Sequence, residues 1–337
     1  MKSRSTMKLF GKSKDAKNPD GQPVTADRAA ETKTTETTDS SKSHPELKLI
    51  SGQQISQASS TPNQQPVKPA PKQPLVPDVK YVVAVASGKG GVGKSTVSAN
   101  LAVALSQMGL KVGLMDADVY GPSIPTMMGI KQQPQVTEQR QLLPINQHGL
   151  SLMSIGFMVP DEQAMIWRGP MLHSAMQQFL GDVIWGELDY LLVDMPPGTG
   201  DAQLSLSQII PLSGTIIVTT PQDVALADVR RSIAMADRME TPLLGIVENM
   251  SYYINPSNNE KVNIFGSGGG EKICQQLDVP LLGQIPIDPK ICDCGDLGTP
   301  IVLAFPDSPQ SISFKRMANQ LIVLVEQLEQ EDELTIQ

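Results

Sequence analysis

One short glycine-rich stretch, "SGKGGVGKS" at Ser87–Ser95, carries residue types that bind phosphate. It fits two templates. As G-x-G-x-x-G, it matches the turn that places the pyrophosphate of a dinucleotide at a helix N-terminus. As G-x-x-x-x-G-K-S, it matches the phosphate-binding loop (P-loop) of nucleoside triphosphatases, whose backbone N–H groups hold the phosphates. Both templates predict a bound nucleotide, but they predict different chemistry.

Two features favour the P-loop. Lys94 and Ser95 directly follow the last glycine, where a lysine binds the β- and γ-phosphates and a serine hydroxyl binds Mg²⁺. Asp194 ends the apolar run "YLLVD", where a Walker-B carboxylate supports the magnesium ion. A dinucleotide site needs neither feature, although Asp116 or Asp118 stands at about the spacing that its acidic residue requires. A chance glycine turn is the remaining alternative.

Alternating strands and helices are expected to position these residues. Apolar, β-branched runs predict strands at Tyr81–Ala86, Lys111–Asp118, Asp189–Gly198, Gly214–Pro221, Pro242–Met250 and Pro280–Asp288. Helical spacing predicts helices near Ser95–Gly109, Arg168–Asp182, Ala202–Ile209, Asp223–Met239, Gly269–Leu277 and Ser311–Gln330. The segment Gln141–Ile155 is expected to form a small antiparallel excursion. This alternation predicts an α/β fold with a doubly wound, mostly parallel sheet covered on both faces.

Composition limits the domain organisation and the possible partners. Residues 1–76 are polar and are predicted to form a disordered tail, followed by a P-loop ATPase domain at 77–330 and an acidic C-terminal tail at 331–337. A net charge of −8 opposes a nucleic-acid partner. No apolar run reaches the ~18 residues of a membrane span. Three cysteines are too few for a disulfide framework and favour a cytoplasmic location.

Lys89 directly follows the first glycine of the loop. The resulting "GKGGVGKS" resembles the deviant Walker A motif of the ATPase family that includes MinD, ParA, the arsenite-pump ATPase and the nitrogenase iron protein. The resemblance implies a homodimer that encloses two ATP molecules. In such a dimer Lys89 reaches the partner's ATP and neutralises charge, as an arginine finger does elsewhere. A solvated loop lysine is the alternative.

The same resemblance assigns roles to acidic residues and to the ATP contacts. In "DADVYGPS" it implies that Asp118 orients or deprotonates the attacking water and that Asp116 supports the metal shell. Two merely solvated carboxylates at a strand end are the alternative. The candidate catalytic residues are Lys89, Lys94 and Asp118, and the candidate Mg²⁺ residues are Ser95, Asp116 and Asp194. The candidate ATP-binding residues are Gly88, Lys89, Gly90, Gly91, Val92, Gly93, Lys94, Ser95, Thr96 and, for the adenine, Asn249.

Further motifs resemble one branch of this family. "DADVYGPS", "DMPPGTGD", "ENMS", "IFGSGGGEK" and "IPIDP" follow one another along the chain, and together they look like the Mrp/ApbC branch of iron–sulfur cluster carrier ATPases. The resemblance covers roughly Asp78 to Leu324. It implies ATP hydrolysis coupled to cluster transfer, with iron–sulfur apoproteins and assembly proteins as partners.

The cysteines depart from that branch. Its members usually carry Cys-x-x-Cys a few residues after "ENMS", where two subunits bind one bridging [4Fe–4S] cluster through thiolates. Here Asn255 and Asn258 stand at those positions, and asparagine is a poor ligand for such a cluster. Cys292 and Cys294 are a candidate relocated pair, or else two incidental cysteines in a loop after the last strand. Cys274 has helical spacing and is expected to be a packed core thiol.

Four functions follow from these motifs. The first is an ATP-hydrolysing, homodimeric iron–sulfur cluster carrier. The second is a nucleotide-gated ATPase adaptor without a cluster, which the two asparagines favour. A MinD- or ParA-like positioning ATPase is opposed by the acidic C-terminus "EQLEQEDELTIQ" and the negative net charge. An ATP-using small-molecule enzyme lacks an additional nucleophile or acid/base pair. The first is our prediction.

Overall fold

The computed structural model describes residues 76–119, 121–157, 176–177 and 179–336. The predicted N-terminal tail therefore lies outside the described residues, apart from Val76. Much of the helix predicted near Arg168–Asp182 also lies outside them, and its described residues 176–177 and 179–182 are helical. Within the described part of the chain, no helix has both the length and the apolar character needed to cross a membrane.

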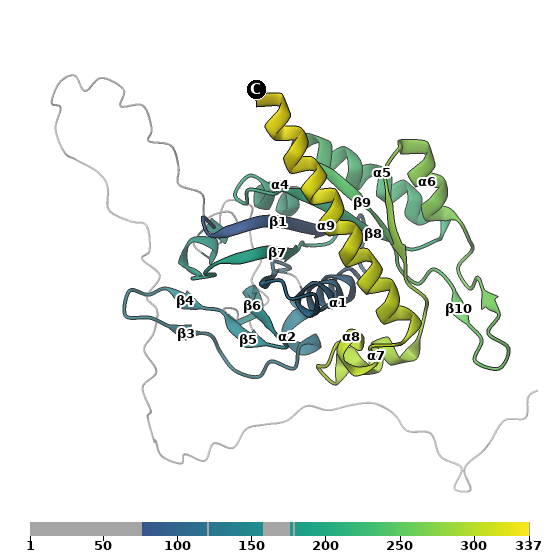
Figure 1. Cartoon of the computed structure of the whole chain (residues 1–337), viewed down its shortest axis with the longest axis horizontal. Helices are drawn as coiled ribbons and strands as arrows, with labels where there is room; N and C mark the ends of the chain where they lie inside the picture. The colour runs from purple at the N-terminus through teal and green to yellow at the C-terminus, as the bar shows by residue number, and fades with distance from the viewer. Residues whose placement is uncertain (1–75, 120, 158–175, 178, 337) are drawn as a thin grey trace, which may run out of the picture. The chain divides into compact units, whose positions relative to one another are not determined.

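A central sheet of eight strands organises the fold, in the order β12-β9-β8-β1-β7-β2-β6-β5 (Figure 1). Its neighbouring strands are parallel except for the β5–β6 pair. The strands are β1 (Val79–Ala86), β2 (Val112–Asp116), β5 (Ile145–Gln147), β6 (Leu150–Ser154), β7 (Leu188–Asp194), β8 (Gly214–Thr219), β9 (Leu243–Glu248) and β12 (Leu281–Gln284). Two small antiparallel ribbons pair β3 (Gln135–Val136) with β4 (Leu142–Leu143) and β10 (Tyr253–Ile254) with β11 (Lys261–Val262).

Helices cover both faces of this sheet. The described helices are α1 (Lys94–Gln107), α2 (Ile124–Met127), α4 (Asp201–Ser207), α5 (Asp223–Arg238), α6 (Gly269–Leu277), α7 (Pro289–Asp296), α8 (Ile301–Ala304) and α9 (Pro309–Ile336), with a 3₁₀ turn at Ile155–Phe157. On one face α1, α8 and α9 bury a shared apolar core. On the other face α4 packs over β1 and β7, and α5 and α6 pack over β8 and β9. The predicted doubly wound, mostly parallel α/β fold is confirmed.

The long helix α9 lies across α1 in Figure 1 and packs against it. Phe314 and Leu321 of α9 are fully buried with Leu101 and Leu105 of α1. The helix continues past its predicted end at residue 330 and reaches Ile336, so the predicted end of the last helix is too early. The sequence "EQLEQEDELTI" contains strong helix formers and no glycine or proline, which explains the continuation.

Two connections differ from the sequence-based expectation. The segment 141–155 does form an antiparallel pair, β5–β6, but β6 also joins the main sheet parallel to β2. The stretch after the last strand is the helix α7 rather than a loop. Asp288 caps this helix by accepting a hydrogen bond from the backbone N–H of Lys290 at 2.9 Å, and Pro289 occupies the first turn. These are standard helix-start signals.

Candidate nucleotide site

The P-loop joins the carboxyl end of β1 to the start of α1. Gly91 and Gly93 have φ angles of 77° and 82°, in the left-handed region that favours glycine. A Cβ atom on Gly93 would lie 2.2 Å from Nδ2 of Asn249, and one on Gly88 would lie 2.5 Å from the carbonyl oxygen of Asp228. The glycines therefore allow both the loop's turn and the close approach of two other segments to its backbone.

A buried ionic cluster lies at the base of the loop. Nζ of Lys94 is 2.8 Å from Oδ2 of Asp194 and 3.9 Å from Oδ2 of Asp118. Ser95 Oγ and Ser98 Oγ donate hydrogen bonds to the two carboxylate oxygens of Asp194, each at 2.6 Å. Because Asp194 is fully buried, its charge is tolerated only with such partners. The fold thus brings together the P-loop lysine, the P-loop serine and the predicted Walker-B carboxylate.

Asp116 shapes the neighbouring acidic loop. Its Oδ1 accepts the backbone N–H of Asp118 at 3.1 Å, and its Oδ2 accepts the backbone N–H of Ile124 and the hydroxyl of Ser154, both at 3.1 Å. Burial and then the carboxylate of Asp194 raise the pKa of Asp116 to about 7. Asp116 therefore fixes the loop that carries Asp118, which is itself buried beside the lysine of the P-loop.

A cavity of about 200 Å³ opens over the loop. Its lining comprises Ser87, Lys89, Gly90, Gly91, Val92, Gly93, Lys94, Ser95, Thr96, Asp118, Ser123, Met127 and Pro197. Lys89 is half-buried there, and its carbonyl oxygen accepts a hydrogen bond from the Ser87 hydroxyl at 3.0 Å. The backbone N–H of Gly198 donates to the Ser87 carbonyl at 2.9 Å. The loop after β7 is thereby hydrogen-bonded to the start of the P-loop.

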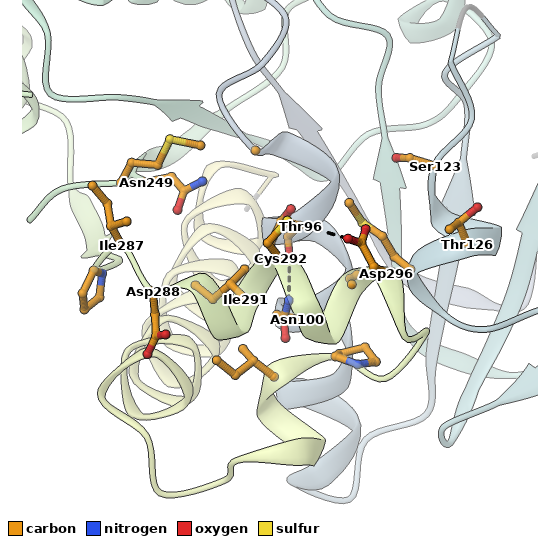
Figure 2. Close-up of a pocket in the computed structure, with 18 of the residues that line it drawn as sticks. Thr96, Asn100, Ser123, Thr126, Asn249, Ile287, Asp288, Ile291, Cys292 and Asp296 are labelled. Carbon is orange, nitrogen blue, oxygen red and sulfur yellow. Dashed lines mark hydrogen bonds between the residues drawn. The ribbon is translucent and has the colours of Figure 1, made fainter. Parts of the chain in front are cut away.

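A second cavity of about 690 Å³ adjoins the loop on the side of Asn249. Figure 2 shows Asn249 and Ile287 at one end and Ser123 and Thr126 at the other. Nδ2 of Asn249 donates to the carbonyl oxygen of Val92 at 2.8 Å. The two cavities share Gly93, Thr96, Ser123 and Met127. Phosphates in the smaller cavity would therefore leave the rest of a nucleotide pointing toward the larger one.

The donor set suits magnesium. Ser95 Oγ supplies a hard oxygen ligand, which Mg²⁺ prefers, and Mg²⁺ usually keeps waters and substrate phosphates as its other ligands. Both oxygens of Asp194 and both oxygens of Asp116 already accept hydrogen bonds from the protein, so both carboxylates fit an outer shell. No group of three or more His, Cys, Asp or Glu side chains suited to a metal ion occurs among the described residues.

The two candidate cluster cysteines occupy different surroundings on α7. Residues two apart on a helix point about 200° away from each other. Cys292 is exposed and lines the larger cavity, with its Sγ 3.9 Å from Oδ2 of Asp296. Cys294 is buried in the apolar core, and burial raises the pKa of its thiol. Cys274 is buried on α6, as expected, and burial raises its pKa to about 11. In this arrangement only Cys292 is available to a ligand.

Asn255 and Asn258, which are expected at the family's cysteine positions, close the β10–β11 hairpin. The Asn255 side-chain oxygen accepts the backbone N–H of Ser257 at 2.9 Å. Asn258 accepts the backbone N–H of Glu260 at 3.0 Å through its side-chain oxygen, and its Nδ2 donates to the Glu260 carboxylate at 3.0 Å. Asparagine commonly supports turns in this way. Their side chains here stabilise a turn.

Three polar contacts of the site were not predicted from the sequence. Ser98 of α1 donates a hydrogen bond to Asp194, and Ser154 of β6 donates one to Asp116. Glu248 is a fully buried carboxylate next to Asn249 in the sequence. Isolated serines carry no spacing signal. The glutamate in "ENMS" ends an apolar run, as Asp194 does. This position at a strand end was the sequence feature that could have indicated a buried carboxylate there.

Comparisons with known proteins agree with this geometry. The family model described as "ParA: NUBPL iron-transfer P-loop NTPase" matches residues 78–322. An "Iron-sulfur cluster carrier protein" of Aquifex aeolicus is 51% identical over 253 residues, which cover 74% of this chain and 70% of that protein.

Solved structures are similar as well. A nucleotide-binding protein of Archaeoglobus fulgidus in complex with ADP is 39% identical, with a TM-score of 0.62, covering 71% of this chain and 93% of that one. The cell division ATPase MinD of Pyrococcus furiosus, at 23% identity and a TM-score of 0.56, shares the fold over 73% of this chain and 99% of its own.

Proposed function

The chain belongs to the family of ParA-type, NUBPL iron-transfer P-loop NTPases, and on that premise we propose that it is a homodimeric ATPase that carries iron–sulfur clusters and transfers them to apoproteins. The observation that carries the ATPase part is the cluster of Lys94, Ser95 and Asp194 at the base of a glycine loop. The proposal that the protein carries iron–sulfur clusters is supported by relatives that are named iron–sulfur cluster carrier proteins and share about half of their aligned residues with this chain.

In this proposal each polar side chain has one task. Backbone N–H groups of the loop and the ammonium of Lys94 bind the phosphates. Ser95 would bind Mg²⁺ directly and Asp194 would support it from the outer shell, and the ion neutralises phosphate charge when bound. Asp118 lies 3.9 Å from Lys94 at the edge of the cavity and orients the attacking water. Lys89 lies at the mouth of the same cavity and neutralises the γ-phosphate of the partner's ATP, as the family resemblance implies.

The ATPase proposal is tested with the two loop lysines. Lys94→Ala should weaken Mg·ATP binding about 10- to 100-fold, because it removes charge-assisted hydrogen bonds. Lys89→Ala should leave the affinity for ATP unchanged but lower kcat about 10³-fold, as loss of an arginine finger does. Binding is measured by calorimetry and turnover by phosphate release.

The matched control is Lys111→Ala, an exposed lysine paired with Glu187 away from the loop. It should change neither quantity. Normal turnover in Lys89→Ala would contradict the proposal that a partner subunit completes the site. Normal ATP affinity in Lys94→Ala would remove this loop from nucleotide binding.

One observation favours the second candidate, a nucleotide-gated adaptor that binds no cluster. The hairpin asparagines Asn255 and Asn258 are engaged in turn hydrogen bonds, and amide groups are poor ligands for iron–sulfur clusters. If a cluster bridges two subunits, Cys292 is the thiol with an exposed position. Cys294 would have to leave the core to join it.

Anaerobic reconstitution with iron and sulfide separates the two candidates. The carrier predicts about four irons per dimer, the content of one [4Fe–4S] cluster, together with a visible absorption band. Cys292→Ser should abolish both, and Cys274→Ser, which changes a core thiol on another helix, should keep them. Absence of iron and sulfide in the unmodified protein would contradict the carrier and leave the ATPase adaptor.

A further inference from the structure

The fully buried carboxylate of Glu248, the last residue of β9, has no role in the proposed hydrolysis. Three segments donate hydrogen bonds to it. The backbone N–H of Gly270 donates to Oε2 at 2.6 Å, and Nε2 of Gln284 donates to Oε1 at 3.0 Å. The hydroxyl of Ser251 also donates to Oε1. Because removing a buried acceptor leaves each of these donors unpaired, the carboxylate holds three segments in place.

Two of these donors lie at the two ends of the segment 252–269, an excursion that leaves the central sheet after β9 and returns at α6. Ser251 precedes the β10–β11 hairpin, and Gly270 follows the return segment at the start of α6. Figure 1 shows β10 extending from the body of the fold below α6. One carboxylate therefore fastens both ends of residues 252–269. We call this contact the Glu248 clamp.

The clamp also replaces a missing helix cap. The N-cap of α6 is Gly268, which has no side chain to accept a hydrogen bond. Glu248 accepts instead from Gly270 in the first turn, where a negative charge is favoured by the helix dipole. A Cβ atom on Gly270 would lie 2.7 Å from Oε2 of Glu248. The glycine run thus permits the carboxylate to reach the helix.

The next residue along the chain contacts the P-loop. Asn249 donates to the carbonyl oxygen of Val92 at 2.8 Å, while Glu248 holds the excursion. The hairpin itself is tied to the wall of the larger cavity, since the backbone N–H of Ile287 donates to the carbonyl of Tyr252 at 2.7 Å. The P-loop and the hairpin are therefore hydrogen-bonded to adjacent residues, Asn249 and Glu248.

We propose that Glu248 is a positioning residue that couples the nucleotide site to the β10–β11 hairpin, so that nucleotide binding alters the order of that hairpin. The coupling rests on the proposed nucleotide site, whereas the clamp itself does not. The coupling would give this chain a surface whose order depends on the bound nucleotide.

Hydrogen exchange of the full chain, resolved by peptide, tests the clamp without nucleotide. Glu248→Gln should speed amide exchange in residues 252–270 about 10- to 100-fold, the effect of losing hydrogen bonds to a charged acceptor. Exchange in β1 and β7 should stay unchanged. The control Glu271→Gln removes the same charge from an exposed site on α6 and should change nothing. Unchanged exchange in Glu248→Gln, or faster exchange throughout the sheet, would overturn the clamp.

A second pair of variants covers the case in which Glu248→Gln does not fold. Ser251→Ala removes a donor at one end of the excursion, and Gln284→Ala removes a donor from β12, outside it. Only Ser251→Ala should speed hairpin exchange. Equal behaviour of the two variants would overturn the proposed role at the ends of the excursion.

Addition of Mg·ATP then tests the coupling. In the unmodified protein ATP should slow exchange in residues 252–262, and in Glu248→Gln this response should be lost. Glu248→Gln should raise KM and keep kcat, because the donors described for Glu248 are Ser251, Gly270 and Gln284, whereas Lys94 pairs with Asp118 and Asp194. An equal ATP response in both proteins would overturn the coupling. Absence of ATP binding in the unmodified protein would instead contradict the proposed function, and the nucleotide-free result would still decide the clamp.

Discussion

Asp116 and Asp194 are direct neighbours at the carboxyl ends of the paired strands β2 and β7. Two buried carboxylates so close together resist simultaneous ionisation. Asp194 is satisfied by Lys94 and two serines, whereas no cation pairs with Asp116 among the contacts described for it. Burial, and then the nearby carboxylate of Asp194, therefore raise the pKa of Asp116 to about 7.

This shift predicts a pH dependence of stability in the protein without nucleotide or magnesium. The unfolded pKa of an aspartate is about 3.9, so between about pH 4 and pH 7 the folded state binds more protons than the unfolded state. Stability therefore falls as pH rises through this range. Asp116→Asn removes this titration and should show a flatter decline. Urea unfolding from pH 5 to 8 measures both slopes, and parallel curves for the two proteins would contradict the raised pKa.

At the scale of elements, α7 decides the chemistry of its two cysteines. Asp288 and Pro289 start a helix directly after the last strand. The helix turns Cys292 toward the larger cavity, where Figure 2 draws it and Thr96 of α1 among the lining residues, and turns Cys294 into the core. In a loop the two thiols would have had independent orientations, but a helix imposes opposite faces on them.

Alkylation with iodoacetamide at pH 8 checks this arrangement. Cys292 should react at least about 100-fold faster than Cys274, because burial and a pKa of about 11 leave little thiolate at Cys274. Cys294 should also react slowly. Mg·ATP should protect Cys292, since its side chain lines the cavity beside the P-loop. Peptide mass spectrometry measures all three, and equal labelling of Cys292 and Cys294 would contradict the orientation of α7.

At the scale of the whole molecule, the P-loop cavity lies at the carboxyl end of the central strand β1. Its lining includes Lys89, which makes no ion pair among those found in the described residues. A cavity-lining lysine without an ion pair would be available to a nucleotide bound by a partner subunit. The proposed dimer is supported by this feature and by the family resemblance.

Asp118→Ala tests the dimer. The variant should bind Mg·ATP and fail to hydrolyse it, because it lacks the group that orients water. Dimers should therefore accumulate with ATP, and sedimentation should give twice the chain mass of 36.3 kDa. Lys94→Ala, which should not bind ATP tightly, is the monomeric control. Normal turnover of Asp118→Ala would remove this aspartate from the mechanism.

The sequence alone determined the nucleotide loop and the type of fold. The P-loop is a contiguous motif, so the spacing of its glycines, Lys94 and Ser95 could be recognised without knowledge of the rest of the fold. Alternating apolar strands and helices predicted the parallel sheet because periodicity is a local property. Asp194 was found because it ends an apolar run, and parallel strands end at the same edge of a sheet.

Only the tertiary structure decided the contacts that join distant segments. The order of the strands places β7 and β8 on either side of β1, which brings Asp194 to Ser98, while the pairing of β9 with β12 brings Glu248 to Gln284. Such contacts depend on the order and the register of the strands, and the spacing of residues along the chain predicts neither of these. The opposite environments of Cys292 and Cys294 likewise arose from how α7 packs, because burial is a property of the assembled fold.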